Sequence, residues 1–66
     1  MNPGSVQPIG NLVVGNRFCF PKDRKKEIAC TIVKVTPQFI EYKKDDAIRS
    51  KTTKDLHQKV IFLKPA

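Results

Sequence analysis

Hydrophobic and polar residues alternate along most of the chain, and the alternation follows strand spacing rather than helix spacing. Residues 16–20 place Phe18 and Phe20 on one face, and Pro21 ends this run because proline donates no hydrogen bond to a ladder. Helical spacing of apolar residues never persists for three turns, and β-branched residues dominate the periodic stretches. The pattern therefore predicts an all-β fold with no helix longer than a turn or two.

The longest predicted strand, residues 27–35, is apolar on both of its faces. Its apolar residues are Ile28, Cys30 and Ile32 on one face, and Ala29, Val33 and Val35 on the other. Such a strand is either buried on both sides or bends between two sheets. Thr36 and Pro37 form the turn that follows it.

Three further strands are predicted at residues 38–44, about 48–53 and 60–63. Residues 54–58 lie between the last two of these strands. They indicate a single 3₁₀ or α turn with Leu56 pointing inward.

The register of the hairpin after residues 38–44 depends on the length of its loop. A three-residue loop of Asp45, Asp46 and Ala47 segregates polar from apolar residues better than a two-residue loop does. Its cross-strand pairs are Lys44 with Ile48, Tyr42 with Ser50, and Ile40 with Thr52. One face then holds Ile40, Tyr42 and Ile48, and the other holds Phe39, Glu41, Lys43, Arg49, Lys51 and Thr53.

In this order of elements the chain resembles the small SH3-like barrels of the Tudor and KOW type. The resemblance covers about residues 14–63 and rests on Val14-Gly15-Asn16-Arg17, on residues 27–35, and on Lys54-Asp55-Leu56 before Val60-Ile61-Phe62-Leu63. It implies a five-stranded barrel with one short 3₁₀ turn before the last strand. The predicted barrel domain spans residues 12–66, and residues 1–11, which include two prolines and two glycines, form a flexible N-terminal arm.

Size and composition limit what such a domain does. The 66 residues are 39% hydrophobic and 29% charged, which fits one folded domain rather than a disordered chain. The longest apolar run, residues 60–63, is far too short to span a membrane, and no apolar stretch follows a basic start as in a secretory signal. The sequence predicts an intracellular protein, cytoplasmic or nuclear.

Candidate catalytic and metal-ligating residues are few. Cys19 and Cys30 alternate with strand hydrophobes, which favours reduced, buried thiols over a disulfide, a redox pair or a metal site. His57 is the only histidine, so a four-ligand zinc site lacks donors. Adjacent Asp45 and Asp46 suit a turn better than acid–base chemistry, and no glycine pattern fits a phosphate loop. The sequence predicts neither an enzyme nor a cofactor.

Basic residues supply the functional signal. Thirteen Lys and Arg against six Asp and Glu give a net charge of +7. Nine of the 13 lie in two segments: Lys22, Arg24, Lys25 and Lys26 in the loop after the first predicted strand, and Lys43, Lys44, Arg49, Lys51 and Lys54 around the hairpin. Lysines also keep small domains soluble, but a clustered positive field attracts phosphate polyanions.

The outer face of the predicted hairpin adds an aromatic ring to these cations. Phe39 beside Arg49 and Lys51 would offer a stacking surface, unless Phe39 fills the core instead. The predicted function is binding of DNA or RNA with phosphate-dominated contacts and weak sequence preference, by a regulatory or accessory protein. The predicted nucleic-acid-binding residues are Lys22, Arg24, Lys25, Lys26, Phe39, Lys43, Arg49, Lys51 and Lys54.

A second hypothesis is a protein-interaction module that binds an acidic protein partner or peptide, such as a small viral or mobile-element regulator of a host enzyme. A methyl-lysine reader of the Tudor kind needs a cage of aromatic rings, most of which this chain needs in its core. The protein is predicted to be a monomer or weak homodimer. A dimer would form along residues 60–63 unless the first strand or the arm covers that edge.

Overall fold

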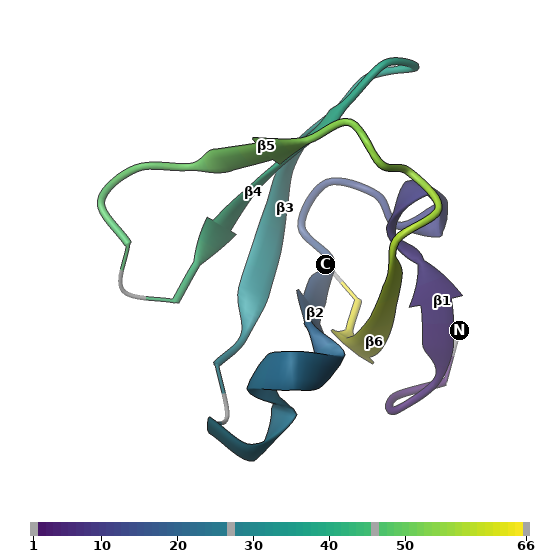
Figure 1. Ribbon diagram of the computed structural model, residues 1–66, viewed down its shortest axis with the longest axis vertical. Coiled ribbons are helices and arrows are strands. Elements are labelled where there is room, and N and C mark those ends of the chain that lie inside the picture. Colours follow the sequence, from purple (N-terminus) through teal and green to yellow (C-terminus); the bar gives the residue numbers. More distant parts are fainter. Residues whose placement is uncertain (1, 27, 46, 66) are drawn as a thin grey trace.

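The computed structural model describes residues 2–26, 28–45 and 47–65, and their fold is all-β, as predicted. Six antiparallel strands form one sheet in the order β1-β6-β2-β3-β4-β5 (Figure 1). The strands are β1 (Val6–Pro8), β2 (Arg17–Cys19), β3 (Cys30–Val35), β4 (Ile40–Lys44), β5 (Lys51–Thr53) and β6 (Lys59–Lys64). Two 3₁₀ helices join them, η1 (Ile9–Asn11) and η2 (Pro21–Lys26). In the described ranges, no helix has the length and apolar character needed to cross a membrane.

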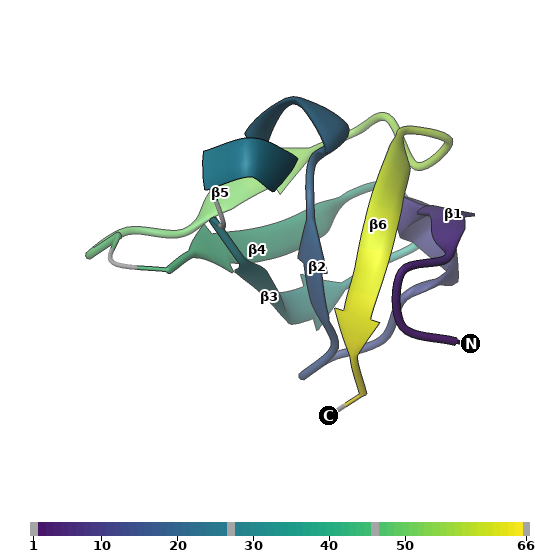
Figure 2. The same ribbon diagram turned by 90° about the horizontal axis from the view of Figure 1, so that it is seen from below.

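The sheet is strongly curved and encloses a core on its concave side. Strands β2 to β5 pair in chain order, and β6 returns to lie between β2 and β1. Figure 2 shows β3 and β4 passing behind β2 and β6 and across their direction. Since β1 and β5 stand at the two ends of the order, the sheet is open and six-stranded, where the sequence predicted a five-stranded barrel.

The core is built from the inward residues of every strand except β1 and β5, together with η1. It consists of Ile9, Leu12, Phe18, Cys30, Ile32, Ile40, Tyr42, Val60 and Phe62. Fully burying such a side chain stabilises the fold by roughly 1.5–3 kcal/mol. Leu56 packs against this core from the turn before β6, as predicted. That turn carries a hydrogen bond from Gln58 N–H to the Asp55 carbonyl, while the 3₁₀ helices lie elsewhere.

A β-bulge explains why the longest strand looked apolar on both faces. Ile32 pairs with Tyr42 and Lys34 with Glu41, so Val33 is an extra residue on β3 with no partner of its own. A bulge shifts the phase of alternation by one residue. Ile32 therefore faces the core and Lys34 faces outward. The observed strand β3 begins at Cys30 and is shorter than the predicted strand of residues 27–35. Residue 27 lies outside the described ranges.

Residues 6–11, which the sequence assigns to the N-terminal arm of residues 1–11, form strand β1 and the 3₁₀ helix η1. Val6, Gln7 and Pro8 pair with β6, and Ile9 is fully buried. Gly10 N–H donates to the Leu56 carbonyl at 2.9 Å, an approach that leaves no room for a larger residue. Because β6 has β1 on one side and β2 on the other, residues 60–63 offer no free edge for pairing with a second copy.

The β4–β5 hairpin has a different register from the predicted one. The observed pairs are Ile40 with Thr53, Glu41 with Thr52, and Tyr42 with Lys51, one residue beyond the expected alignment. The loop runs from residue 45 to residue 50, and Ile48 is 93% exposed in it instead of joining the apolar face. Asp46, one of the three predicted loop residues, lies outside the described ranges.

Candidate nucleic-acid interface

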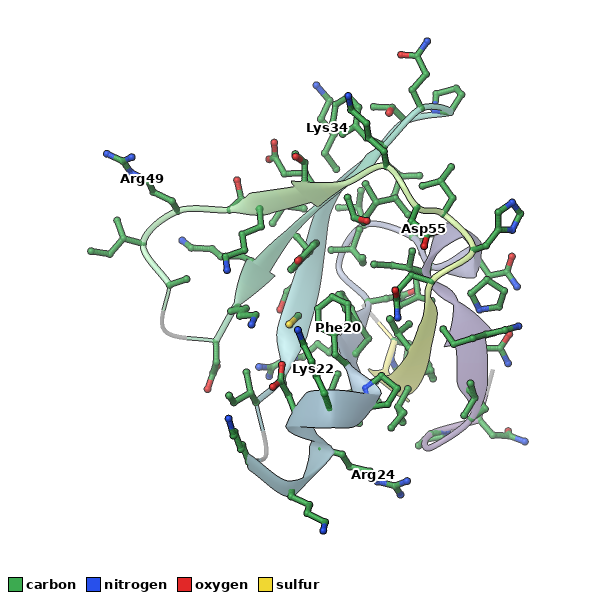
Figure 3. All side chains as sticks on the ribbon, in the orientation of Figure 1. Phe20, Lys22, Arg24, Lys34, Arg49 and Asp55 are labelled. Carbon is green, nitrogen blue, oxygen red and sulfur yellow. The ribbon has the colours of Figure 1, made fainter. Side chains whose placement is uncertain are left out.

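A hollow of about 450 Å³ opens on the concave side of the sheet, beside η2. Its lining comes from four places in the chain: the β2–η2 junction, β4, β5 and the turn before β6. The lining residues are Phe20, Pro21, Lys22, Tyr42, Lys44, Lys51 and Gln58. Figure 3 shows Phe20 near the middle of the molecule with the Lys22 side chain reaching toward it.

The register of β4 and β5 brings two of the lysines into the hollow. Directly opposed residues of an antiparallel pair project from the same face of the sheet. Lys51 lies opposite Tyr42, and Lys44 lies opposite Cys30, and both of these partners are core residues. The two lysines therefore emerge on the concave side, at the rim of the core.

Helix η2 brings the third lysine. Pro21 supplies a fixed φ suited to a first helical position, and the Asp23 N–H donates to the Phe20 carbonyl at 2.9 Å, which closes the first turn. The Asp23 carboxylate is buried, and its Oδ2 lies 3.7 Å from the Lys44 Nζ on β4. This ion pair joins η2 to the sheet and so places Lys22 beside Phe20.

Three aromatic rings meet edge-to-face beneath the hollow. Phe20 lies 5.4 Å from Phe18 and 5.5 Å from Tyr42, measured between ring centroids, with interplanar angles of 81° and 65°. Phe18 and Tyr42 are buried, whereas Phe20 is only partly buried. The Lys22 Nζ lies over the Phe20 ring, 6.0 Å from its centroid, a contact worth about 0.5–1 kcal/mol at an exposed site. One face of Phe20 is thus open to groups in the hollow.

The charge of the hollow is strongly positive. Of the carboxylates that the structure describes, only Asp23 lies within ion-pair distance of a hollow lysine, and it contacts Lys44. Lys22 and Lys51 have no such carboxylate within that distance among the same residues. By contrast, Arg17 outside the hollow is offset by Asp45, with Nη2 and Oδ1 3.5 Å apart. The hollow therefore favours anions.

The two cysteines are buried, free thiols, as predicted. Burial raises the pKa of the Cys19 thiol, and it raises that of Cys30 to about 11. Burial likewise raises the pKa of the Tyr42 hydroxyl. Protonated, enclosed thiols are poor nucleophiles and poor metal ligands. Across residues 2–26, 28–45 and 47–65, no three His, Cys, Asp or Glu side chains gather as a metal site would require.

The structure brings together only two of the nine predicted binding residues, Lys22 and Lys51. Arg24 and Arg49 point away from the hollow at opposite sides of the molecule (Figure 3). Phe39 is half-buried in the β3–β4 turn, where its N–H donates to the Thr36 Oγ1 at 2.9 Å. The predicted residues that do not line the hollow are Arg24, Lys25, Lys26, Phe39, Lys43, Arg49 and Lys54.

The lining residues that the sequence did not predict are Phe20, Pro21, Tyr42, Lys44 and Gln58. Lys51 was predicted as a binding residue on the outer face with Phe39, but a register one residue longer places it opposite Tyr42, in the hollow. The sequence predicts Phe20 as the last residue of a strand over residues 16–20, whereas it lies one residue beyond β2, at the entrance to η2. No pattern in the sequence pointed to Gln58.

Comparison of the chain with protein-family models, with curated proteins and with solved structures finds no match.

Proposed function

We propose that this protein binds nucleic acid, DNA or RNA, through the hollow, with phosphate contacts that carry little sequence preference. The observation that supports this proposal is the convergence of three lysines, Lys22, Lys44 and Lys51, from three separate elements on one aromatic-floored recess. Lysines that merely keep a domain soluble have no reason to converge. The net charge of +7 adds a long-range attraction for polyanions.

The same lysines argue against a cationic ligand. A methyl-lysine reader encloses a cation in aromatic faces, and its cage gains nothing from neighbouring ammonium groups. Here Phe20 and Tyr42 share the recess with three ammonium groups, and Lys22 already lies over the Phe20 ring. An anion with an attached flat ring suits this chemistry better.

For the fold, we propose an SH3-like small barrel of the Tudor and KOW type, formed by strands β2 to β6. The return of β6 to the side of β2, after a meander of four strands, supports this layout because it curls the sheet toward closure. In this proposal β1 is an addition on the outer side of β6. We further propose an accessory or regulatory role inside the cell, where nucleic acid is present.

The proposed function is tested by removing two charges from the hollow and, as a control, two charges from elsewhere. The hollow variant is Lys22→Gln with Lys51→Gln; the matched control is Lys34→Gln with Lys43→Gln, on exposed positions of β3 and β4 outside the hollow. Equilibrium binding to a single-stranded and a duplex oligonucleotide is measured over a range of salt concentrations.

We expect the hollow variant to bind about tenfold or more weakly, and its slope of log affinity against log salt to shrink by about 1.4–1.8, as for two lost phosphate contacts. The control should lose far less. No binding of DNA or RNA by the wild-type protein at low salt would overturn the proposal, and an acidic protein partner would then explain the charge. Equal losses in both variants would exclude the hollow as the binding site.

A further inference from the structure

We propose that the hollow takes one unpaired base together with its flanking phosphates, so that the protein selects single strands over duplexes. This inference rests on the proposed function and adds the class of nucleic acid to it. It starts from the aromatic floor of the recess rather than from its charge.

Phe20 offers the surface on which a base would stack. Its ring makes edge-to-face contacts with the buried rings of Phe18 and Tyr42, at 5.4 and 5.5 Å between centroids, and these contacts favour one orientation. Its open face is marked by the Lys22 ammonium, which lies 6.0 Å from the ring centroid on that side. Bases in a duplex are already stacked on both sides, whereas a single strand can place a base on an exposed ring.

The shape of the site also favours a base. Its volume of about 450 Å³ lies within the range of roughly 300–1,000 Å³ typical of small-molecule sites. Phosphate contacts along a duplex need only a flat or convex basic surface, and they leave such a recess unexplained. Gln58 at the wall carries an amide. Its Nε2 donates to the Lys59 carbonyl at 3.2 Å, and its second N–H and its Oε1 match the hydrogen-bonding edge of a base.

The lysines then take the phosphates on either side of the base. Lys51 comes from β5 and Lys22 from η2, two separate elements that line the recess. Lys22 changes partner on binding: the base replaces it on the Phe20 face, and its flexible side chain swings to the adjacent phosphate. Lys44 stays beside Asp23, which holds η2 in place.

The test compares Phe20→Leu with Phe39→Leu. Each change removes one partly buried phenyl ring and keeps an apolar side chain, but only Phe20 lines the hollow. Binding is measured at one fixed salt concentration to a single-stranded oligonucleotide, to a hairpin duplex of equal phosphate number, and to an abasic strand that has phosphates without bases.

We expect the wild-type protein to prefer the single strand over the duplex and over the abasic strand by about tenfold or more, the scale of one stacked base. Phe20→Leu should lose this preference and keep its duplex affinity, while Phe39→Leu behaves as wild type. Adenosine monophosphate should compete far more weakly than the oligonucleotide, because it brings only one phosphate.

Several results would overturn the inference and leave the proposed function standing. These are equal wild-type affinity for single strand and duplex, equal affinity for abasic and normal strands, or equal effects of the two phenylalanine variants. Competition by the mononucleotide as strong as by the oligonucleotide would identify a free nucleotide as the ligand instead. The abasic comparison uses only the wild-type protein, so it decides the question even if Phe20→Leu fails to fold. Absence of binding to every nucleic acid would overturn both proposals together.

Discussion

At the scale of single residues, Asp23 has two opposing effects on this protein. Its buried carboxylate ties η2 to Lys44 on β4, which stabilises the fold. The same negative charge lies at the edge of a site that is otherwise positive. Its Oδ2 has no hydrogen-bond donor within the described residues, so the ion pair at 3.7 Å is its chief compensation. The Asp23 carboxylate therefore increases the stability of the fold and decreases the affinity of the hollow for anions.

Replacing Asp23 with Asn should separate these two effects. We expect the free energy of unfolding to fall by about 1–2 kcal/mol, because a partly buried ion pair is lost while the side-chain shape is kept. Affinity for a single-stranded oligonucleotide should rise several-fold, because Lys44 becomes available to phosphate. Urea unfolding and equilibrium binding measure the two quantities. Asp55→Asn, at an exposed position, is the control, and a fall in both stability and affinity for Asp23→Asn would contradict this account.

At the scale of elements, β1 covers the outer side of β6 and is itself the last strand at that end of the sheet. Gly4 N–H donates to the Phe62 carbonyl at 2.7 Å, and Phe62 N–H donates to the Ser5 carbonyl at 2.9 Å. The apolar strand β6 thus has both of its sides hydrogen-bonded. Without β1, its outer edge would be a template for pairing with another chain.

Deletion of residues 2–8 tests this role of β1. We expect a loss of about 2–3 kcal/mol in stability, as for two or three backbone hydrogen bonds, and a melting temperature lower by about 10–20 °C. The truncated protein should also self-associate, which sedimentation detects. Val6→Thr keeps the backbone pairing at an exposed position and serves as the control. A truncated protein that melts like the full chain and stays monomeric would show that β1 has no such role.

The sequence predicts the central strands well because their alternation is regular and their ends are marked by proline and turn residues. Prediction of strands fails where a strand is very short or where its alternation of apolar and polar residues is interrupted. β1 has three residues, one of them proline, so it looks like part of an arm, and only its pairing with β6 defines it. The bulge at Val33 shifts the inward–outward alternation of β3 by one residue. The sequence does not reveal this shift, because it does not show which residues pair across the strands.

The candidate site was harder to predict than the fold, for a related reason. Placing Lys51 depends on the hairpin register, and an error of one residue moves a side chain to the other face of a sheet. Charge clusters along the sequence also mislead: Arg24 and Lys22 are two residues apart, yet only Lys22 lines the hollow. Sequence proximity indicates a basic region, and the fold decides which cations act together.

At the scale of the whole molecule, the surplus of seven positive charges affects folding as well as binding. Like charges confined to a small compact domain repel one another, and this repulsion disfavours the folded state. Salt screens it over a Debye length of about 10 Å at 0.1 M, which is comparable with the radius of gyration of 10.6 Å.

Folding stability and affinity for nucleic acid should respond to salt in opposite directions. Raising sodium chloride from about 0.05 M to about 0.5 M should raise the melting temperature by a few degrees, since self-repulsion is screened. Over the same range, affinity for an oligonucleotide should fall steeply. Thermal unfolding and binding titrations in the same buffers test this pair of trends. A melting temperature that drops with salt would indicate that attractive ion pairs, rather than repulsion, dominate the surface.

The chain has one tyrosine and no tryptophan, and that tyrosine, Tyr42, lies in the wall of the hollow. Its ultraviolet emission therefore reports on this place alone. A base that enters the recess would come within quenching distance of the phenol ring, whereas a ligand held only at the outer lysines would leave the signal nearly unchanged. The protein thus contains its own optical probe, and occupancy of the recess is readable without a dye or a label.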